Sequence, residues 1–192
     1  MNIVIFGPPG AGKGTQSNFI VKKFKLHQLS TGELLRKEIK DQTNLGNQIK
    51  SIINSGNLVS DEIVSDLIEK YIGDNIYKNR LIFDGYPRNL NQATNLGNLL
   101  IKYNQKIDMV LKLSVSLETI KKRIFERHSL EKRADDNEKI AIKRYETYEK
   151  NINPIIGFYK QSNLLKVVNG EASISEISDE ISDLIEGKKG WL

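Results

Sequence analysis

A glycine-rich segment, Gly7–Thr15, follows the first apolar run of the chain and constrains the fold more than any other feature. Its sequence GPPGAGKGT contains the pattern GxxxxGK, which connects a buried strand to the start of a helix. The glycines let consecutive backbone N–H groups point at a phosphate, with the positive end of the helix dipole behind them. We therefore expect a phosphate-binding loop (P-loop), in which Lys13 supplies the full positive charge.

Apolar runs of strand length alternate with helical patterns along the rest of the chain. The predicted strands are Ile3–Phe6, His27–Leu29, Leu81–Phe83, Met109–Leu113 and Leu164–Val168. The predicted helices include Thr15–Phe24, Asp61–Tyr71, Asn89–Tyr103, Leu117–Arg127, Asn137–Asn151 and Ile174–Ile185. Such alternation indicates parallel βαβ units, so we expect an α/β fold whose ligand crevice lies beyond the carboxyl ends of the strands.

Two regions interrupt this alternation. From Thr31 to Tyr71 three helical patterns follow one another without a strand, with breaks near Asp41–Asn44 and Ser55–Ser60. From His128 to Asp136 the sequence is rich in charge and poor in apolar residues, so it cannot belong to the core. We expect both regions to lie beyond the sheet edge, where lids and binding flaps occur.

The composition excludes several classes of protein. A chain of 192 residues has the length of one domain. The absence of cysteine excludes a thiolate zinc site, a redox cysteine pair and a cysteine nucleophile. The N-terminus lacks the pattern of a signal peptide, and no apolar run approaches the ~18 residues of a membrane span. We therefore expect a cytoplasmic protein without membrane contact.

The basic residues narrow the choice of ligand. The net charge of +5 fits a nucleic acid and equally a small polyphosphate. Only seven of the 29 basic residues are arginines, which makes them candidates for positions where a planar, bidentate group binds phosphate, although arginine is also common on surfaces. They are Arg36, Arg80, Arg88, Arg123, Arg127, Arg133 and Arg144.

The predicted strand at Leu81–Phe83 leads into Asp84 and then, through a Gly-Tyr-Pro turn, into Arg88. Asp84 stands where a Walker-B carboxylate would hold a metal ion. Gly14 follows the P-loop lysine and the hydroxyl comes one residue later, at Thr15, so direct ligation of Mg²⁺ by a hydroxyl beside the lysine is not expected. We predict that Asp84 holds Mg²⁺ through water.

The chain resembles the adenylate kinases of the nucleoside monophosphate kinase family over essentially its whole length. The match is carried by Gly7–Thr15, by STGELLR at 30–36, by DGYPR at 84–88 with Gln92, and by RADD at 133–136 with Arg144. The family's DGFPR box has Tyr86 in place of Phe here. The resemblance implies reversible phosphoryl transfer from MgATP to AMP, giving two ADP and balancing the adenine nucleotides.

The resemblance also implies the domain organisation. It gives a P-loop NTPase-like five-stranded parallel sheet flanked by helices, in a single kinase domain. The core would comprise residues 1–29, 60–126 and 137–192, with a helical AMP-binding flap at 30–59 and a short lid at 127–136. Only five residues separate Arg127 from Arg133, which is similar to the short-lid form without zinc. The implied partners are ATP, AMP, ADP and Mg²⁺, with no nucleic acid, and a monomer is the family expectation.

Site residues are carried over position by position from the family. The expected ATP-binding residues are Gly10, Ala11, Gly12, Lys13, Gly14, Thr15, Arg127 and Ala172. The expected AMP-binding residues are Thr31, Arg36, Asn57, Leu58, Val59, Gly85, Tyr86, Pro87, Arg88, Gln92, Arg133 and Arg144. The residues expected to act on the transferring phosphoryl group are Lys13, Arg88, Arg123, Arg133 and Arg144.

Two questions stay open at this point: which base the acceptor nucleotide carries, and whether the protein belongs to another functional class. Thr31 and Gln92 match the family's adenine-side pair, whereas UMP/CMP kinases tend to have Ala and Asn there. Asn89 stands where adenylate kinases often carry Thr. The alternative that the chain is a UMP/CMP kinase therefore remains. A GTP-binding switch needs an NKxD box, and the nearest string, Asn104–Asp108, has an extra residue. A nucleic-acid-binding module needs an aromatic platform and a basic stripe, which the sequence lacks.

Overall fold

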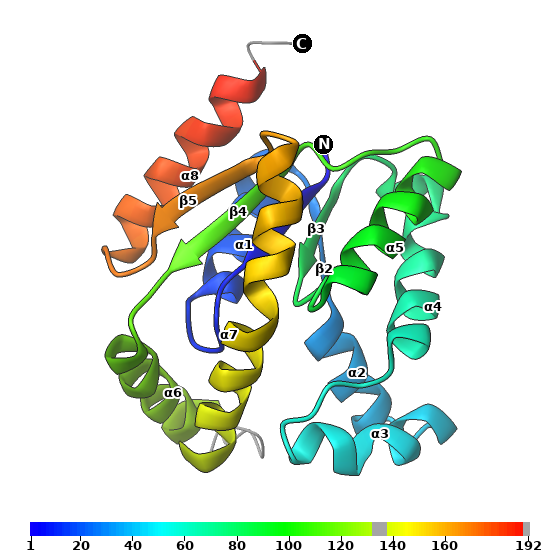
Figure 1. The fold of residues 1–192 in the computed structure, drawn as a ribbon, viewed down its shortest axis with the longest axis vertical. Helices are drawn as coiled ribbons and strands as arrows, with labels where there is room; N and C mark the ends of the chain where they lie inside the picture. The colour runs from blue at the N-terminus through cyan, green and yellow to red at the C-terminus, as the bar shows by residue number, and fades with distance from the viewer. Residues whose placement is uncertain (132–137, 190–192) are drawn as a thin grey trace.

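The computed structural model describes residues 1–131 and 138–189, and in it five parallel strands form one sheet (Figure 1). The strands are β1 (Ile3–Phe6), β2 (His27–Ser30), β3 (Leu81–Asp84), β4 (Met109–Ser114) and β5 (Leu165–Asn169). Their order in the sheet is β2-β3-β1-β4-β5, so β1 is central and carries the P-loop at its carboxyl end. This confirms the predicted α/β class and the five-stranded parallel sheet.

Helices cover both faces of the sheet. They are α1 (Lys13–Phe24), α2 (Thr31–Lys40), α3 (Asn44–Asn54), α4 (Asp61–Ile72), α5 (Leu90–Lys102), α6 (Leu117–Glu131), α7 (Glu138–Gln161) and α8 (Ile174–Lys189), with a short 3₁₀ helix at Asn75–Tyr77. None of the described helices is both long and apolar enough to cross a bilayer. Figure 1 shows α2 and α3 on one side, and α6 with the first half of α7 on the other, below the carboxyl ends of the strands.

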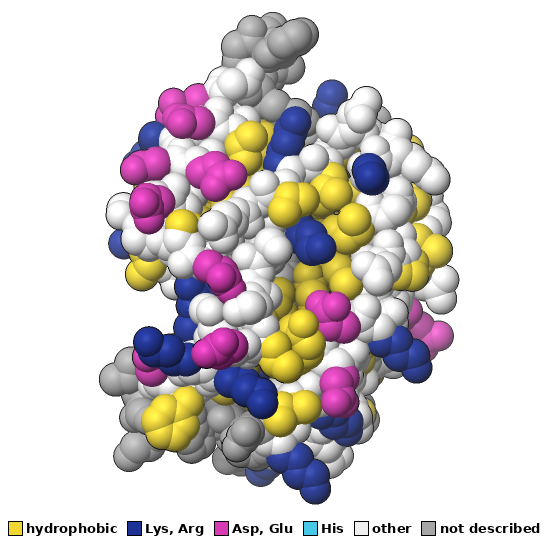
Figure 2. Space-filling view, turned by 60° about the vertical axis from the view of Figure 1, so that its left-hand side comes forward, with side chains coloured by type: hydrophobic (Ala, Val, Ile, Leu, Met, Phe, Trp, Pro, Cys, Tyr) yellow, Lys and Arg dark blue, Asp and Glu magenta, His cyan; other side chains and the backbone are white. Residues whose placement is uncertain are grey.

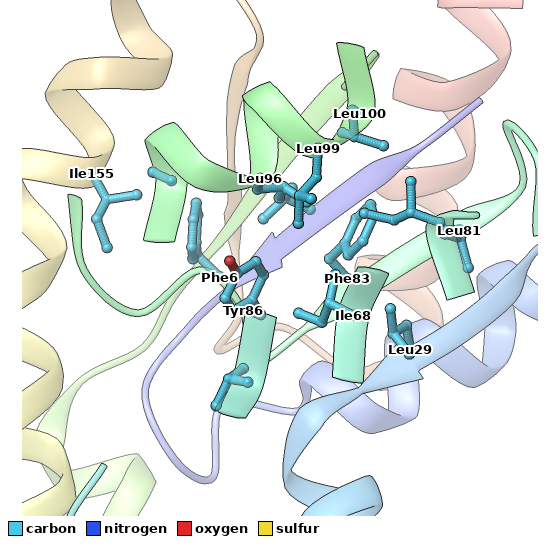
Figure 3. Close-up of a cluster of buried hydrophobic side chains, with 14 of the residues drawn as sticks. Phe6, Leu29, Ile68, Leu81, Phe83, Tyr86, Leu96, Leu99, Leu100 and Ile155 are labelled. Carbon is cyan, nitrogen blue, oxygen red and sulfur yellow. The ribbon is translucent and has the colours of Figure 1, made fainter. Parts of the chain in front are cut away.

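Alternating side chains of the strands build two cores. On β1, Ile3 and Ile5 pack with residues of α1 and α8, while Val4 and Phe6 face α4, α5 and α7. This is the two-residue period of a strand, with apolar residues on both faces because both are covered. Figure 3 shows the second core, where Phe6, Phe83 and Tyr86 lie among aliphatic side chains of α4, α5 and α7.

Helix α7 differs from its predicted range, Asn137–Asn151. It continues through Pro154 to Gln161, although a proline inside a helix removes one backbone hydrogen bond. The side chains of Ile152, Ile155 and Tyr159 are almost completely buried against the second core. Burying each such side chain stabilises the fold by about 1.5–3 kcal/mol. The sum for the three side chains exceeds the cost of a proline inside the helix. Similarly, α6 ends at Glu131 rather than at Arg127, since charged residues can extend a helix without adding apolar periodicity.

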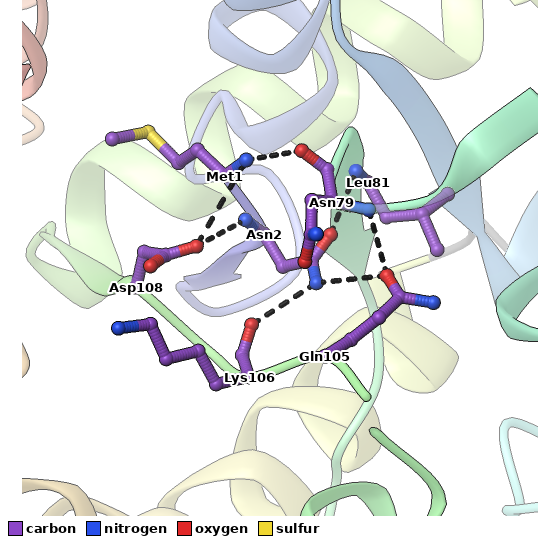
Figure 4. Close-up of polar contacts among 7 residues, drawn as sticks. All are labelled: Met1, Asn2, Asn79, Leu81, Gln105, Lys106 and Asp108. Atoms are coloured by element: carbon purple, nitrogen blue, oxygen red, sulfur yellow. Dashed lines mark hydrogen bonds and ion pairs between the residues drawn. The ribbon is translucent and has the colours of Figure 1, made fainter. Parts of the chain in front are cut away.

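A buried asparagine, Asn2, connects the amino ends of three strands (Figure 4). Its Oδ1 accepts from the backbone N–H of Leu81 at 3.1 Å, and its Nδ2 donates to the carbonyl of Lys106 at 3.0 Å and to Gln105 Oε1 at 3.2 Å. Its backbone N–H donates to Asp108 Oδ2 at 2.7 Å. The side chain is completely buried, so the N–H of Leu81 and the carbonyl of Lys106 take their partner from Asn2, whereas Gln105 Oε1 also accepts from the backbone N–H of Asn79 at 2.7 Å.

We expect Asn2→Ala to lower the free energy of unfolding by about 2–4 kcal/mol, because the buried N–H of Leu81 and the carbonyl of Lys106 would lose these bonds. Urea denaturation followed by circular dichroism measures this change. The matched control is Asn98→Ala on the exposed side of α5, which we expect to change stability by less than about 0.5 kcal/mol. Equal stabilities of the two variants would contradict the structural role of Asn2.

Candidate active site

The P-loop lies between β1 and α1 as predicted. Gly10 and Gly12 have φ angles of +82° and +91°, a region that residues with a Cβ rarely adopt. Gly12 is also the N-cap of α1 and makes no side-chain capping bond, so the helix begins on a bare backbone turn. Such a turn, with the positive end of the helix dipole behind it, is suited to bind phosphate oxygens.

Lys13 is the first residue of α1, and its ammonium group is held over the loop. Its Nζ donates to the carbonyl of Gly7 at 2.8 Å and to that of Pro8 at 3.0 Å. Burial lowers the pKa of Lys13 to about 8, an effect that Asp84 opposes and that the nearby charges of Arg88, Arg144 and Arg127 reinforce. Cations from β3–α5, α6 and α7 therefore act electrostatically on the same ammonium group, and a polyanion between them would relieve their repulsion.

A cavity opens beside Lys13 and is lined by four basic side chains from four separate segments. Of the residues predicted from the sequence, Lys13, Arg36, Asn57, Leu58, Val59, Gly85, Pro87, Arg88 and Arg144 line it. On the face that Figure 2 shows, by contrast, acidic and basic side chains are interspersed. The concentration of one sign of charge thus distinguishes the cavity from that face, and such an arrangement is suited to bind phosphate groups.

One wall of the cavity was not predicted. Thr147, Tyr148, Ile152 and Ile155 of α7 line it together with Arg144. Their spacing places them on one helical face, so the signal was present in the sequence. Among residues 1–131 and 138–189 the buried Oη atom of Tyr148 has no hydrogen-bond partner, and burial raises the pKa of this phenol.

The segment after β3 places Arg88 at the cavity. Its Nε donates to the carbonyl of Gly85 at 2.6 Å. A Cβ on Gly85 would lie only 3.0 Å from both the Arg88 guanidinium and the Thr31 hydroxyl, and its φ of +77° also favours glycine. Thr31 Oγ1 donates to the Gly85 carbonyl at 2.9 Å. The side chain of Tyr86 points away from the cavity into the second core, so Tyr86 can offer a ligand only its backbone.

Asp84 is suited to hold a hydrated cation. It is the last residue of β3 and almost completely buried, and Gln28 Nε2 donates to its Oδ2 at 2.9 Å. No cluster of three or more acidic, histidine or cysteine side chains occurs among residues 1–131 and 138–189 that could enclose a metal. Mg²⁺ usually keeps several waters and binds one or two carboxylates plus phosphates. A single carboxylate beside a phosphate loop therefore fits an ion that arrives with its nucleotide.

The remaining predicted residues lie around the cavity or apart from it. Arg123 reaches from α6 to the carbonyl of Ala11, at 3.5 Å, and Arg127 acts on Lys13 through its charge. Gln92 is almost completely buried on α5. Ala172 packs against the first core, and neither Gln92 nor Ala172 is among the lining residues. Arg133 lies outside the described residues.

The fold and this site define a P-loop enzyme that transfers phosphoryl groups between nucleotides. A family model described as adenylate kinase matches residues 5–164. The adenylate kinase of Pelagibacter ubique is 41% identical over 97% of this chain and its own whole length. That of Porphyromonas gingivalis is 38% identical over 97% of this chain and 96% of its own length, and that of Maricaulis maris is 41% identical over 98% and 100%. The chain belongs to the adenylate kinase family, which confirms the resemblance seen in the sequence.

Proposed function

We propose that this chain transfers a phosphoryl group reversibly from MgATP to AMP, giving two ADP. The observation that carries the proposal is the cavity in which Lys13, Arg36, Arg88 and Arg144 come together from four separate segments. Phosphoryl transfer requires mainly positioning and the neutralisation of charge on the transferring group. Four cations around one cavity, with a P-loop at its wall, supply both.

The two nucleotides would occupy opposite sides of the transferring group. ATP would bind with its phosphates in the loop Gly10–Thr15, with Arg123 and Arg127 of α6 beside them. AMP would bind under α2 and α3, with Arg36 and Arg88 on its phosphate and Asn57–Val59 beside its base. Arg144 lines the cavity and acts on Lys13, so it can contact both sides, and Arg133 would join it.

The base of AMP would be read by Thr31 and Gln92. Hydrogen-bonding side chains of this kind discriminate strongly, because a wrong base leaves buried polar groups unpaired. Mg²⁺ would arrive with ATP and neutralise phosphate charge, held by Asp84 through water. We further propose that the protein acts as a monomer in the cytoplasm.

An ADP-formation assay with AMP, CMP, UMP and GMP as acceptors tests the proposal. We expect kcat/KM for AMP to exceed that for each of the other three acceptors by at least about 10²-fold, because the bases of UMP and GMP leave a polar group of the pocket unpaired and the smaller base of CMP does not fill it. Preference for CMP or UMP would instead identify a pyrimidine nucleotide kinase of the same family. Absence of transfer to every acceptor would refute the proposed activity.

A further inference from the structure

The side-chain amide of Gln92 is held in one orientation by its neighbours. Its Oε1 accepts from the backbone N–H of Arg88 at 2.7 Å, and its Nε2 donates to Asp61 Oδ1 at 2.7 Å. An ionised carboxylate can only accept, and a backbone N–H can only donate. A reversed amide would face Asp61 with its oxygen and Arg88 with its NH₂ group, so both bonds would become repulsive contacts.

Asp61 is itself held in place by a second amide. Asn89 Nδ2 donates to both carboxylate oxygens, at 3.0 and 3.1 Å. The other end of the same side chain, Asn89 Oδ1, accepts from the backbone N–H of Gln92 at 2.8 Å and caps α5. Asn89 thus connects the first residue of α4 to the first turn of α5.

This arrangement leaves Gln92 with one donor and one acceptor for a ligand. A glutamine amide has two N–H donors and two acceptor sites, and Asp61 and Arg88 each occupy one. Arg88 lines the cavity, as does Val59, which precedes Asp61 by two residues. Gln92 and Asp61 are not themselves among the lining residues, so the amide is held next to the cavity wall through its contact with Arg88.

The direction of the amide distinguishes two kinds of base. Adenine and cytosine present an amino donor beside a ring-nitrogen acceptor, whereas hypoxanthine, guanine and uracil present a keto acceptor beside a ring N–H. An amide that can pair with the first pattern must turn over to pair with the second. Because Asp61 and Arg88 resist that reversal, the orientation of Gln92 selects between the patterns.

We propose that Asp61 is a specificity-determining residue, which fixes the side-chain amide of Gln92 so that amino bases are accepted and keto bases rejected. The proposal rests on the proposed function, in which Gln92 reads the acceptor base. Asp61 acts through Gln92 and is a positioning residue. Discrimination by base size, such as adenine against cytosine, does not depend on it.

The test is Asp61→Asn, which keeps the shape of the side chain but can donate as well as accept. We measure kcat/KM for AMP and for IMP, which differs from AMP at the 6-position and N1 alone, and for CMP and UMP. Without the charge-assisted bond to Asp61, only the contact with Arg88 opposes reversal of the Gln92 amide. We therefore expect the ratio of kcat/KM for AMP to that for IMP to fall by about tenfold or more. The CMP:UMP ratio falls similarly, while the AMP:CMP ratio stays within about twofold.

The matched control is Glu62→Gln, which removes the same charge from the next, exposed residue of α4 and leaves all ratios unchanged. If Asp61→Asn does not fold, as judged by circular dichroism, Asp61→Ser removes the carboxylate while keeping a residue favoured at helix starts. An unchanged AMP:IMP ratio, or an equal loss with all four nucleotides, overturns the proposal. Failure of the proposed function would give a result distinct from these two outcomes, because the parent chain itself would then not phosphorylate AMP.

Discussion

Lys13→Met is expected to reduce kcat by about 10²–10³-fold or more, because a preorganised cation at the transferring group is worth several kcal/mol in the transition state. The side chains have similar length and the P-loop glycines are unchanged, so the variant should fold. Initial rates of ADP formation at saturating nucleotide measure the loss. Activity within about threefold of the parent would contradict the role of Lys13.

The same variant carries a second prediction, on stability against pH. Burial lowers the pKa of Lys13 from 10.5 to about 8, so at pH values between these limits the unfolded chain binds more protons than the folded one. The stability that Lys13 contributes therefore rises with pH across this window and is lowest below pH 8. Methionine does not titrate, so the stability of the parent relative to Lys13→Met should rise from pH 7 to pH 10 by an amount on the order of 2 kcal/mol.

Urea denaturation at pH 7, 8, 9 and 10 measures this difference. Lys22→Met is the matched control, since Lys22 is exposed on the same helix and should show no comparable trend. A stability difference for Lys13→Met that stays constant over this range would mean that burial does not disfavour the charged ammonium of Lys13 in the folded chain. The cations near Lys13 would then act on it less than their arrangement implies.

Most of the sheet could be predicted from the sequence because parallel strands covered on both faces are continuous apolar runs. Ile3–Phe6 is such a run, and its bounds agree with those of β1. The end of α7 could not be predicted in this way, because Pro154 favours termination locally while the burial of Ile155 and Tyr159 is a property of the folded chain. Tertiary packing decided that boundary.

The residues of the site likewise fall into those that local sequence predicts and those that depend on the folded chain. Lys13 and Arg88 could be placed from the sequence because each lies within a few residues of the glycines that shape its loop. The partner of Gln92 could not be, because Asp61 lies 31 residues away and on another helix. For the same reason the Asn2 network could not be predicted, since its partners are 79 to 106 residues distant along the chain.

Arg88→Lys should lower kcat/KM for AMP by about 10²-fold, although it keeps the positive charge. The Arg88 guanidinium uses Nε to bind the Gly85 carbonyl at 2.6 Å, which fixes the plane of the group, and the planar fork of a guanidinium matches the geometry of a phosphate. A lysine ammonium is a point charge with no such plane, so it would lose the anchor and the bidentate contact together.

Arg80→Lys provides the matched control for this loss. The Arg80 guanidinium also binds a backbone carbonyl, that of Lys25, through Nε at 3.2 Å and Nη2 at 2.8 Å, but it does not line the cavity. We expect it to leave kcat/KM unchanged within about twofold, since a surface substitution of this kind costs about 0.5 kcal/mol or less. If Arg88→Lys also retained the kcat/KM of the parent, charge alone would suffice at position 88. The loss seen with Arg88→Lys and not with Arg80→Lys would instead assign the effect to the planar fork at the cavity.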